Sequence, residues 1–159
     1  MPSVLFVCTA NLCRSPMAAA LFRDLLAKSG LAEAWQVESA GTWGFDGYPA
    51  MPQTQVVLQE RGLDVRQHRS RRVSAELLRP FDLILVMERG QREALRIEFP
   101  ELAHRVHMLT ELSCPPYSVP EPFENEPAEY RELRDELAEL LERGFGRLVE
   151  LAEARNAFM

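Results

Sequence analysis

The sequence predicts an α/β protein: a single-domain, three-layer sandwich in which a four-stranded parallel sheet is covered by helices on both faces. Short apolar runs suited to buried strands recur along the chain, and segments with helical spacing follow them. Repeated strand-then-helix units produce a parallel sheet with right-handed crossovers. A length of 159 residues, of which 47% are apolar and 26% charged, fits one domain with a sizeable core across residues 1–159.

The first strand and helix carry the clearest signals. Residues 4–7 are apolar, mostly branched and uninterrupted, as expected for a strand covered on both faces. A helix is expected to follow, with Ser15 as its N-cap and Pro16 as its first residue, because these types favour those positions. It is expected to run to about Lys28 and to end at Gly30.

The remaining elements alternate in the same way. A second strand is expected at residues 35–40, followed by a Gly-rich loop with three aromatic side chains at residues 41–49. Further elements are expected, in chain order, as helices at 51–61 and 74–78, a strand at 81–87, a polar helix ending near Phe99, a strand at 105–109 and the longest helix from Pro127. We favour the flavodoxin-like strand order 2-1-3-4.

Charge and cysteine content exclude several classes of function. A net charge of −6 and the lack of a long apolar run argue against nucleic-acid and membrane partners. Three cysteines form no disulfide framework, and the nearby pair Cys8 and Cys13, with no signal peptide, fits the reducing cytoplasm. His104 and His107 lack the spacing of a metal site, so no metal or other cofactor is expected.

The segment between the first strand and the first helix has the character of an anion site. Backbone N–H groups of residues 8–14 and the positive helix terminus attract an anion, and this field favours the thiolate form of Cys8. Arg14 adds a bidentate guanidinium, and Ser15 a hydroxyl hydrogen bond to the thiolate. The alternative is a buried structural Cys8 with a surface Arg14. A Gly- and Lys-containing phosphate loop is excluded, because the segment has neither residue.

A second reactive group is expected at the same edge of the sheet. Ligands of parallel sheets bind at the carboxyl ends of the strands, where Cys8 ends the first strand and a proline-rich loop follows the fourth. Glu121 lies in that loop between Pro120 and Pro122, which fix the backbone. Its carboxylate can therefore approach Cys8 and act as an acid and then a base, although an ordinary surface position is the alternative. The basic run at residues 66–72 is typical of a solvated face, with a phosphate-binding role as its alternative.

Residues 7–18 resemble the signature of the low molecular weight protein tyrosine phosphatases, and the likeness extends over residues 4 to about 150. It implies a phosphatase with a phosphocysteine intermediate, in which Cys8 is the nucleophile, Arg14 the phosphate clamp and Glu121 the general acid and base. It also implies a phosphorylated protein as substrate and a phosphate oxyanion in the site, in a monomer or weak dimer. The implied binding residues are Thr9, Ala10, Asn11, Leu12, Cys13 and Ser15 in the loop, Trp43 and Phe123 as aromatic walls, and Ser39 and His68 as supports that hydrogen-bond with Asn11.

The sequence departs from the family pattern at three positions. Ala10 stands where the family has glycine, which costs ~1 kcal/mol if the backbone there has positive φ. Glu88 and Glu121 replace aspartates, and each extra methylene moves the carboxyl by about 1.5 Å. Reduced or altered activity is therefore an expectation.

Four functions compete on this resemblance. Hydrolysis of protein phosphotyrosine and small aryl phosphates ranks first, because the apolar Leu12 resembles the tyrosine-directed enzymes. Thr9 and the helix that begins near Tyr130 instead resemble the protein-arginine phosphatase branch. An arsenate reductase requires additional cysteines near residues 80–90, where this chain has none. A weakly active or inactive phosphoprotein-binding module is the alternative from another class. Cys13 beside Cys8 suggests protection of the site by a reversible disulfide.

Overall fold

The computed structural model describes residues 1–122 and 126–156, and within them four strands form one parallel sheet in the order β2-β1-β3-β4. The strands are β1 (Ser3–Cys8), β2 (Gln36–Gly41), β3 (Leu83–Val86) and β4 (Val106–Met108). This is the order predicted from the sequence. Strands β2 and β3 lie on opposite sides of β1, so the chain reverses the direction in which it adds strands at this point. In parallel sheets a ligand is expected at the carboxyl ends of the strands where this reversal occurs, here at the end of β1.

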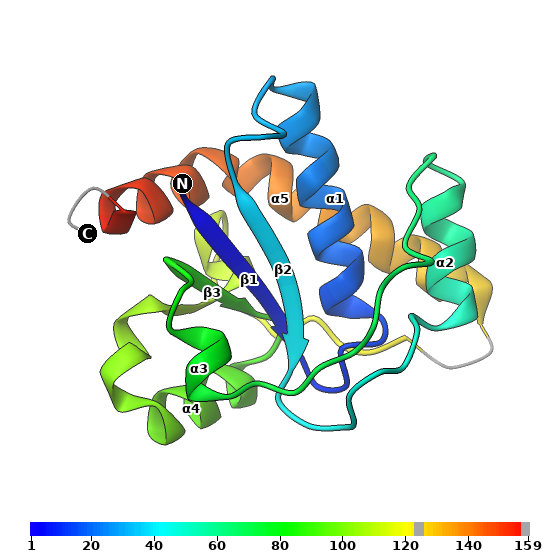
Figure 1. The fold of residues 1–159 in the computed structure, drawn as a ribbon. Helices are drawn as coiled ribbons and strands as arrows, with labels where there is room; N and C mark the ends of the chain where they lie inside the picture. The colour runs from blue at the N-terminus through cyan, green and yellow to red at the C-terminus, as the bar shows by residue number, and fades with distance from the viewer. Residues whose placement is uncertain (123–125, 157–159) are drawn as a thin grey trace.

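Helices cover both faces of the sheet (Figure 1). Helices α1 (Arg14–Lys28), α2 (Pro52–Gln59) and α5 (Pro127–Asn156) lie on one side. The short α3 (Ala75–Leu78) and α4 (Arg89–Glu98) lie on the other, and the 3₁₀ turns are Pro100–Arg105 and Leu109–Leu112. None of the helices in the described part of the chain is both long and apolar enough to span a bilayer.

The central strand β1 is buried from both sides. Val4 and Phe6 belong to the hydrophobic cluster with α1 and α5, whereas Leu5 and Val7 belong to the cluster with α3 and α4. All four side chains are completely buried. Because successive side chains of a strand point to opposite faces, an uninterrupted apolar run supplies both cores, as the sequence predicted. The strand therefore fixes Cys8 rigidly at its carboxyl end.

The predicted start of the first helix is wrong. Helix α1 begins at Arg14, with Cys13 in the N-cap position, rather than after Ser15. The hydroxyl of Ser15 lies within hydrogen-bonding distance of Cys8 and Asn11 and therefore does not cap the helix. Ser74, predicted as the first residue of the third helix, is instead its N-cap and accepts a hydrogen bond from the Leu77 N–H at 3.1 Å. The other elements lie where they were predicted, with small differences at their ends.

Candidate active site

The loop between β1 and α1 is held by the backbone of later segments. The carbonyl groups of Cys8, Thr9 and Leu12 accept hydrogen bonds from the N–H groups of Thr42, Trp43 and Met51, each at 2.9 Å. The loop also packs tightly against Gly41, where an added Cβ would lie 2.6 Å from the Thr9 carbonyl oxygen. A side chain at position 41 would therefore displace the loop that carries the candidate nucleophile.

Asn11 is the central hydrogen-bonding residue of the loop. Its side-chain amide donates to the hydroxyls of Ser15 (2.8 Å) and Ser39 (2.9 Å), and its side-chain oxygen accepts from the Arg71 N–H (3.0 Å). The His68 ring contacts the Asn11 carbonyl oxygen at 2.7 Å, and because that oxygen only accepts, Nε2 carries the proton. The hydrogen bonds expected among Asn11, Ser39 and His68 are thus present, with Ser15 and Arg71 as further partners.

The condition under which Ala10 would cost stability, a positive φ at that residue, is not met. Among the described non-glycine residues, only Asn11 has a positive φ, of 61°. Asparagine adopts this left-handed conformation more readily than most residues, and here four hydrogen-bonding partners hold it. The replacement of the family's glycine by alanine at position 10 therefore carries no left-handed backbone cost.

Cys8 is almost fully buried, and Ser15 contacts its sulfur. The Ser15 hydroxyl lies 3.0 Å from Cys8 Sγ, and the Ser15 N–H donates to the same sulfur at 3.4 Å. Asn11 donates to the Ser15 oxygen, and the single Ser15 hydroxyl proton has two acceptors within reach, the Cys8 sulfur and the Ala40 carbonyl at 3.3 Å. The Ser15 N–H, the Ser15 hydroxyl and the amino terminus of α1 therefore all lie beside the sulfur of Cys8.

Arg14 is a buried cation beside the loop, with only 1% of its side chain exposed. One guanidinium nitrogen, Nη1, donates to Glu88 Oε2 at 2.5 Å and to the Val119 carbonyl at 2.8 Å. The other, Nη2, lies 3.3 Å from the Thr9 hydroxyl. Its Nε is buried and has no hydrogen-bond partner among the described residues. A buried, unpartnered donor on a cation is the group that an oxyanion would satisfy.

The proline-rich loop brings Glu121 to the same cation. The Val119 N–H donates to the Met87 carbonyl at 2.8 Å, which joins this loop to the end of β3. Glu121 Oε1 lies 3.5 Å from Arg14 Nη2, and 59% of its side chain is exposed. Arg14 and Val119 are 105 positions apart in sequence. The predicted approach of the two loops is therefore observed.

The other predicted binding residues differ in exposure. Thr9, Ala10 and Leu12 are half-buried, whereas Cys13 is buried. Trp43 is 67% exposed, and the Arg72 guanidinium lies 5.2 Å from its ring centroid, within cation–π range. Trp43 therefore stands beside the loop with most of its indole accessible. Phe123, predicted as the second aromatic wall, lies outside the described residues.

The sequence analysis missed three residues that contact this site. Gln91 on α4 donates to the Thr9 hydroxyl at 3.0 Å and accepts from the Met87 N–H at 2.9 Å. Arg71 holds Asn11 through its backbone, and Gly41 allows the close packing of the loop. A glycine directly after a strand was an available signal for Gly41. Arg71 lies in the basic run at residues 66–72, whereas no sequence signal distinguishes Gln91 from an ordinary surface residue.

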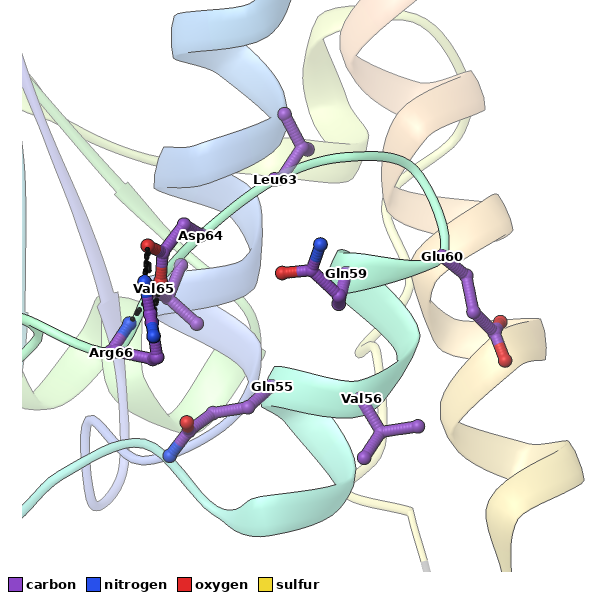
Figure 2. A pocket seen from close by; sticks show the side chains of 8 residues that line it. All are labelled: Gln55, Val56, Gln59, Glu60, Leu63, Asp64, Val65 and Arg66. Carbon is purple, nitrogen blue, oxygen red and sulfur yellow. Dashed lines mark hydrogen bonds and ion pairs between the residues drawn. The ribbon is translucent and has the colours of Figure 1, made fainter.

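The candidate site is not identified by a large groove. A groove of about 490 Å³ lies between α2 and the segment that follows it (Figure 2). Its walls include Val56, Leu63 and Val65, and none of the residues of the loop. Glu121 lines a smaller groove of about 370 Å³ with Pro120, Pro122 and residues at the start of α5. The reactive groups, rather than the cavity volume, identify the loop as the candidate site.

Oxidation provides a test of the second thiol in the loop. Burial raises the pKa of Cys13 to about 12, with a further contribution from the nearby Cys8. One equivalent of peroxide oxidises Cys8 to a sulfenic acid, and attack by the Cys13 sulfur then forms a disulfide and releases water. Since the attacking species is the thiolate, we expect disulfide formation in the oxidised protein to accelerate as pH rises toward 12.

The protein is treated with peroxide and then with dithiothreitol. The measurement is the fraction of Cys8 that can again be alkylated, with protection by a bound anion as the sign that the alkylated thiol is Cys8. We expect full recovery in the natural sequence and in Cys114→Ser, and clearly smaller recovery in Cys13→Ser. Equal recovery in Cys13→Ser would remove Cys13 from the protection of Cys8.

Comparisons with known proteins agree with this geometry. Residues 3–154 match the family model for low molecular weight phosphotyrosine protein phosphatases. The chain is 32% identical over 142 residues to the probable low molecular weight protein-tyrosine-phosphatase EpsP of Ralstonia nicotianae, covering 89% of this chain and 90% of that protein. It is 33% identical over 141 residues to a protein-arginine-phosphatase of Geobacillus stearothermophilus, covering 88% and 91%.

A solved structure gives the same result for the fold. The crystal structure of a low molecular weight protein tyrosine phosphatase from T. tengcongensis superposes with a TM-score of 0.86 and 31% identity, covering 92% of this chain and 99% of that one. The family model spans nearly all of the chain. The chain belongs to the low molecular weight phosphotyrosine protein phosphatase family of cysteine-dependent hydrolases.

Proposed function

We propose that this protein hydrolyses phosphotyrosine in proteins, and small aryl phosphates, through a phosphocysteine intermediate. The observation that supports this most strongly is the arrangement around Cys8: its sulfur accepts a hydrogen bond from the Ser15 N–H and contacts the Ser15 hydroxyl, next to the buried Arg14. A nucleophile, a cation and a nearby carboxylate at Glu121 are the three groups that hydrolysis of a phosphate ester requires.

In the first step the Cys8 thiolate attacks phosphorus, and the bond between phosphorus and the leaving oxygen breaks. The loop N–H groups and Arg14 hold the equatorial oxygens as negative charge accumulates on them. Glu121, protonated for this step, gives its proton to the leaving oxygen, so that a neutral alcohol departs.

In the second step Glu121, now a carboxylate, accepts a proton from water. The water oxygen attacks phosphorus and the phosphorus–sulfur bond breaks, which releases inorganic phosphate and restores the thiolate. Ser15 stabilises the departing sulfur through the same contacts that hold it in the resting protein. Glu121 thus serves both steps from one position, next to the cation that binds the phosphoryl group.

The proposal is tested by steady-state hydrolysis of p-nitrophenyl phosphate, followed by phosphotyrosine and phosphoarginine peptides of matched sequence. We expect turnover of the aryl phosphate above the Cys8→Ser background and the higher kcat/KM on the phosphotyrosine peptide. A radiolabelled phosphoryl group trapped on Cys8 after acid quenching would identify the intermediate. Turnover no higher than that background would refute the proposed phosphatase activity. The remaining hypothesis would then be a module that binds phosphorylated proteins.

A protein-arginine phosphatase is the second candidate, because a relative that covers most of the chain carries that name. Thr9 supports it, since its hydroxyl is fixed in the site by Arg14 and Gln91. The half-buried, apolar Leu12 favours the tyrosine substrate instead. A higher kcat/KM on the phosphoarginine peptide would decide for the arginine enzyme.

The replacement Glu121→Gln is expected to separate its acid role from simple charge effects. It removes the transferable proton, so kcat on a phosphotyrosine peptide should fall roughly 10²-fold. The loss with p-nitrophenyl phosphate should be smaller, because its leaving group is a stable anion that needs less protonation. Glu132→Gln is the matched control, since Glu132 lines the same groove and its replacement removes the same charge. Equal losses on both substrates, or in both variants, would argue against a proton donor at position 121.

The partners and location follow from the same proposal. Phosphorylated proteins are the proposed partners, bound through a phosphoryl group at the loop. A cytoplasmic location is proposed because Cys8, Cys13 and Cys114 are all free thiols, as a reducing compartment would keep them.

A further inference from the structure

A second basic pocket lies behind the loop. Two adjoining cavities, of about 290 and 240 Å³, share Arg23, Ser39 and His68 as lining residues. Arg69, Arg71 and Glu38 complete the wall of the larger one. We call this set of residues the arginine pocket. Three guanidinium groups and the Glu38 carboxylate thus line the larger cavity, in a protein whose net charge is −6. The smaller cavity is also lined by Asp64, which pairs with Arg66.

Two of these arginines have no carboxylate partner in the described part of the chain. Arg71 pairs with Glu38 at 2.5 Å. Arg23 donates to the Val37 carbonyl, and Arg69 donates to the carbonyls of Arg66 and His68; among the described residues no carboxylate lies within ion-pair distance of either. Other exposed arginines of this chain, such as Arg66 and Arg131, do pair with acidic side chains. The arginine pocket therefore has positive charge that the described protein groups do not neutralise.

The arginine pocket is connected directly to the candidate catalytic loop. His68 Nε2 donates to the Asn11 carbonyl, the Arg71 N–H donates to the Asn11 side chain, and Ser39 accepts from the same side chain. Asn11 is the loop residue with positive φ. A ligand that moves His68, Ser39 or Arg71 would therefore change the position of Asn11 and, through Asn11, of the Ser15 hydroxyl beside Cys8.

We propose that the arginine pocket is a second oxyanion site, which binds a phosphate group and adjusts the catalytic loop through Asn11. Guanidinium groups match the geometry of phosphate oxygens, and those of Arg23 and Arg69 are available from two different segments of the chain. Burial lowers the pKa of His68, and Arg23, Arg71 and Arg69 lower it further, so their positive field extends to the ring. Binding in the pocket does not depend on the proposed function; the effect on turnover rests on it.

The test is a titration of the ¹⁵N-labelled protein with inorganic phosphate and, separately, with glycerol 3-phosphate, followed by amide chemical shifts. We expect two midpoints: one for amides of residues 8–14, and a different one for Ser39, His68, Arg69 and Arg71. The Asn11 amide should respond at both midpoints, because it contacts both sites. If glycerol 3-phosphate binds more tightly than inorganic phosphate, the ligand is an esterified phosphate. If the two bind equally, the ligand is the free phosphate ion.

Matched variants test whether the second midpoint arises from the arginine pocket. The double variant Arg23→Gln/Arg69→Gln should raise the dissociation constant of the second set about tenfold or more, since it removes two charged donors. The loop set should change less than twofold. Arg131→Gln, which removes one positive charge from an arginine that pairs with Glu60 away from this pocket, should change neither. Arg69→Gln alone, whose side chain donates only to backbone carbonyls, gives an intermediate effect with minimal risk to folding.

A single midpoint for all amides, unaltered in the double variant, would overturn the second site. The effect on turnover is measured with p-nitrophenyl phosphate: phosphate should inhibit the natural sequence with a non-competitive component that the double variant lacks. Purely competitive inhibition in both proteins would overturn the regulatory part. If the chain has no phosphatase activity, the amide titration still decides the binding site and its coupling to Asn11, so failure of the proposed function is distinguishable from failure of this inference.

Discussion

Replacing Cys8 by serine is expected to lower kcat for p-nitrophenyl phosphate by at least about 10⁴-fold, the scale seen when a nucleophile is removed from a catalytic unit. The hydroxyl is far less ionised than a thiol at neutral pH, so attack on phosphorus nearly stops. The substitution exchanges sulfur for oxygen and keeps a group that can hydrogen-bond with Ser15, so the fold should be retained. Steady-state kinetics and a thermal melt of the same preparation measure both effects.

Cys114→Ser is the control for the Cys8 experiment. It makes the same chemical change at a half-buried thiol outside the loop, whose sulfur donates to the Thr110 carbonyl at 3.1 Å. Full activity is expected in that variant. Substantial turnover in Cys8→Ser, or a comparable loss in Cys114→Ser, would contradict the assignment of Cys8 as nucleophile.

Replacing Arg14 by lysine is expected to have the second largest effect, a fall in kcat/KM of about 10³-fold, since it removes a preorganised donor set for the phosphoryl oxygens. Lysine keeps the charge, but its single ammonium cannot bridge Glu88, Val119 and an oxyanion together. The loss of buried hydrogen bonds should also lower the free energy of unfolding by about 1–3 kcal/mol. Kinetics with p-nitrophenyl phosphate and urea denaturation measure the two quantities.

Arg134→Lys separates these two losses. Arg134 resembles Arg14 in being largely buried, with Glu60 and the Val57 carbonyl as partners, but it lies on α5 and contacts none of the loop residues that the structure describes. A loss of stability with unchanged kcat/KM is expected there. If Arg14→Lys lost stability and retained its kcat/KM, Arg14 would be a structural ion-pair residue and not a phosphate clamp.

Several features of this protein followed from the sequence by itself. The apolar run at residues 4–7 determined a strand buried on both faces, because that periodicity depends only on consecutive residues. The close spacing of Cys8, Arg14 and Ser15 determined that they meet around one loop, since a short loop between a strand and a helix restricts where its side chains can lie. The order of strands and helices determined the sheet and the edge that carries this loop.

The tertiary structure decided the details of the site. It assigned the Ser15 hydroxyl to Cys8 rather than to a helix cap, and it placed the positive φ at Asn11 rather than at Ala10. These outcomes depend on partners such as Ser39 and His68, which reach Asn11 from distant segments. A local pattern predicts conformations that neighbouring residues favour, but it does not contain the identity of distant hydrogen-bond partners.

The same limit applied to charge. The basic run at residues 66–72 indicated an ordinary solvated face, since a sequence does not reveal which arginine reaches a carboxylate. In the folded chain Arg66 pairs with Asp64 and Arg71 with Glu38, whereas Arg69 lines the arginine pocket with Arg23 from α1. The sequence determined the amount of positive charge in this segment. Only the fold determined which charges are neutralised, because ion pairing falls off steeply with distance and the distances are set by packing.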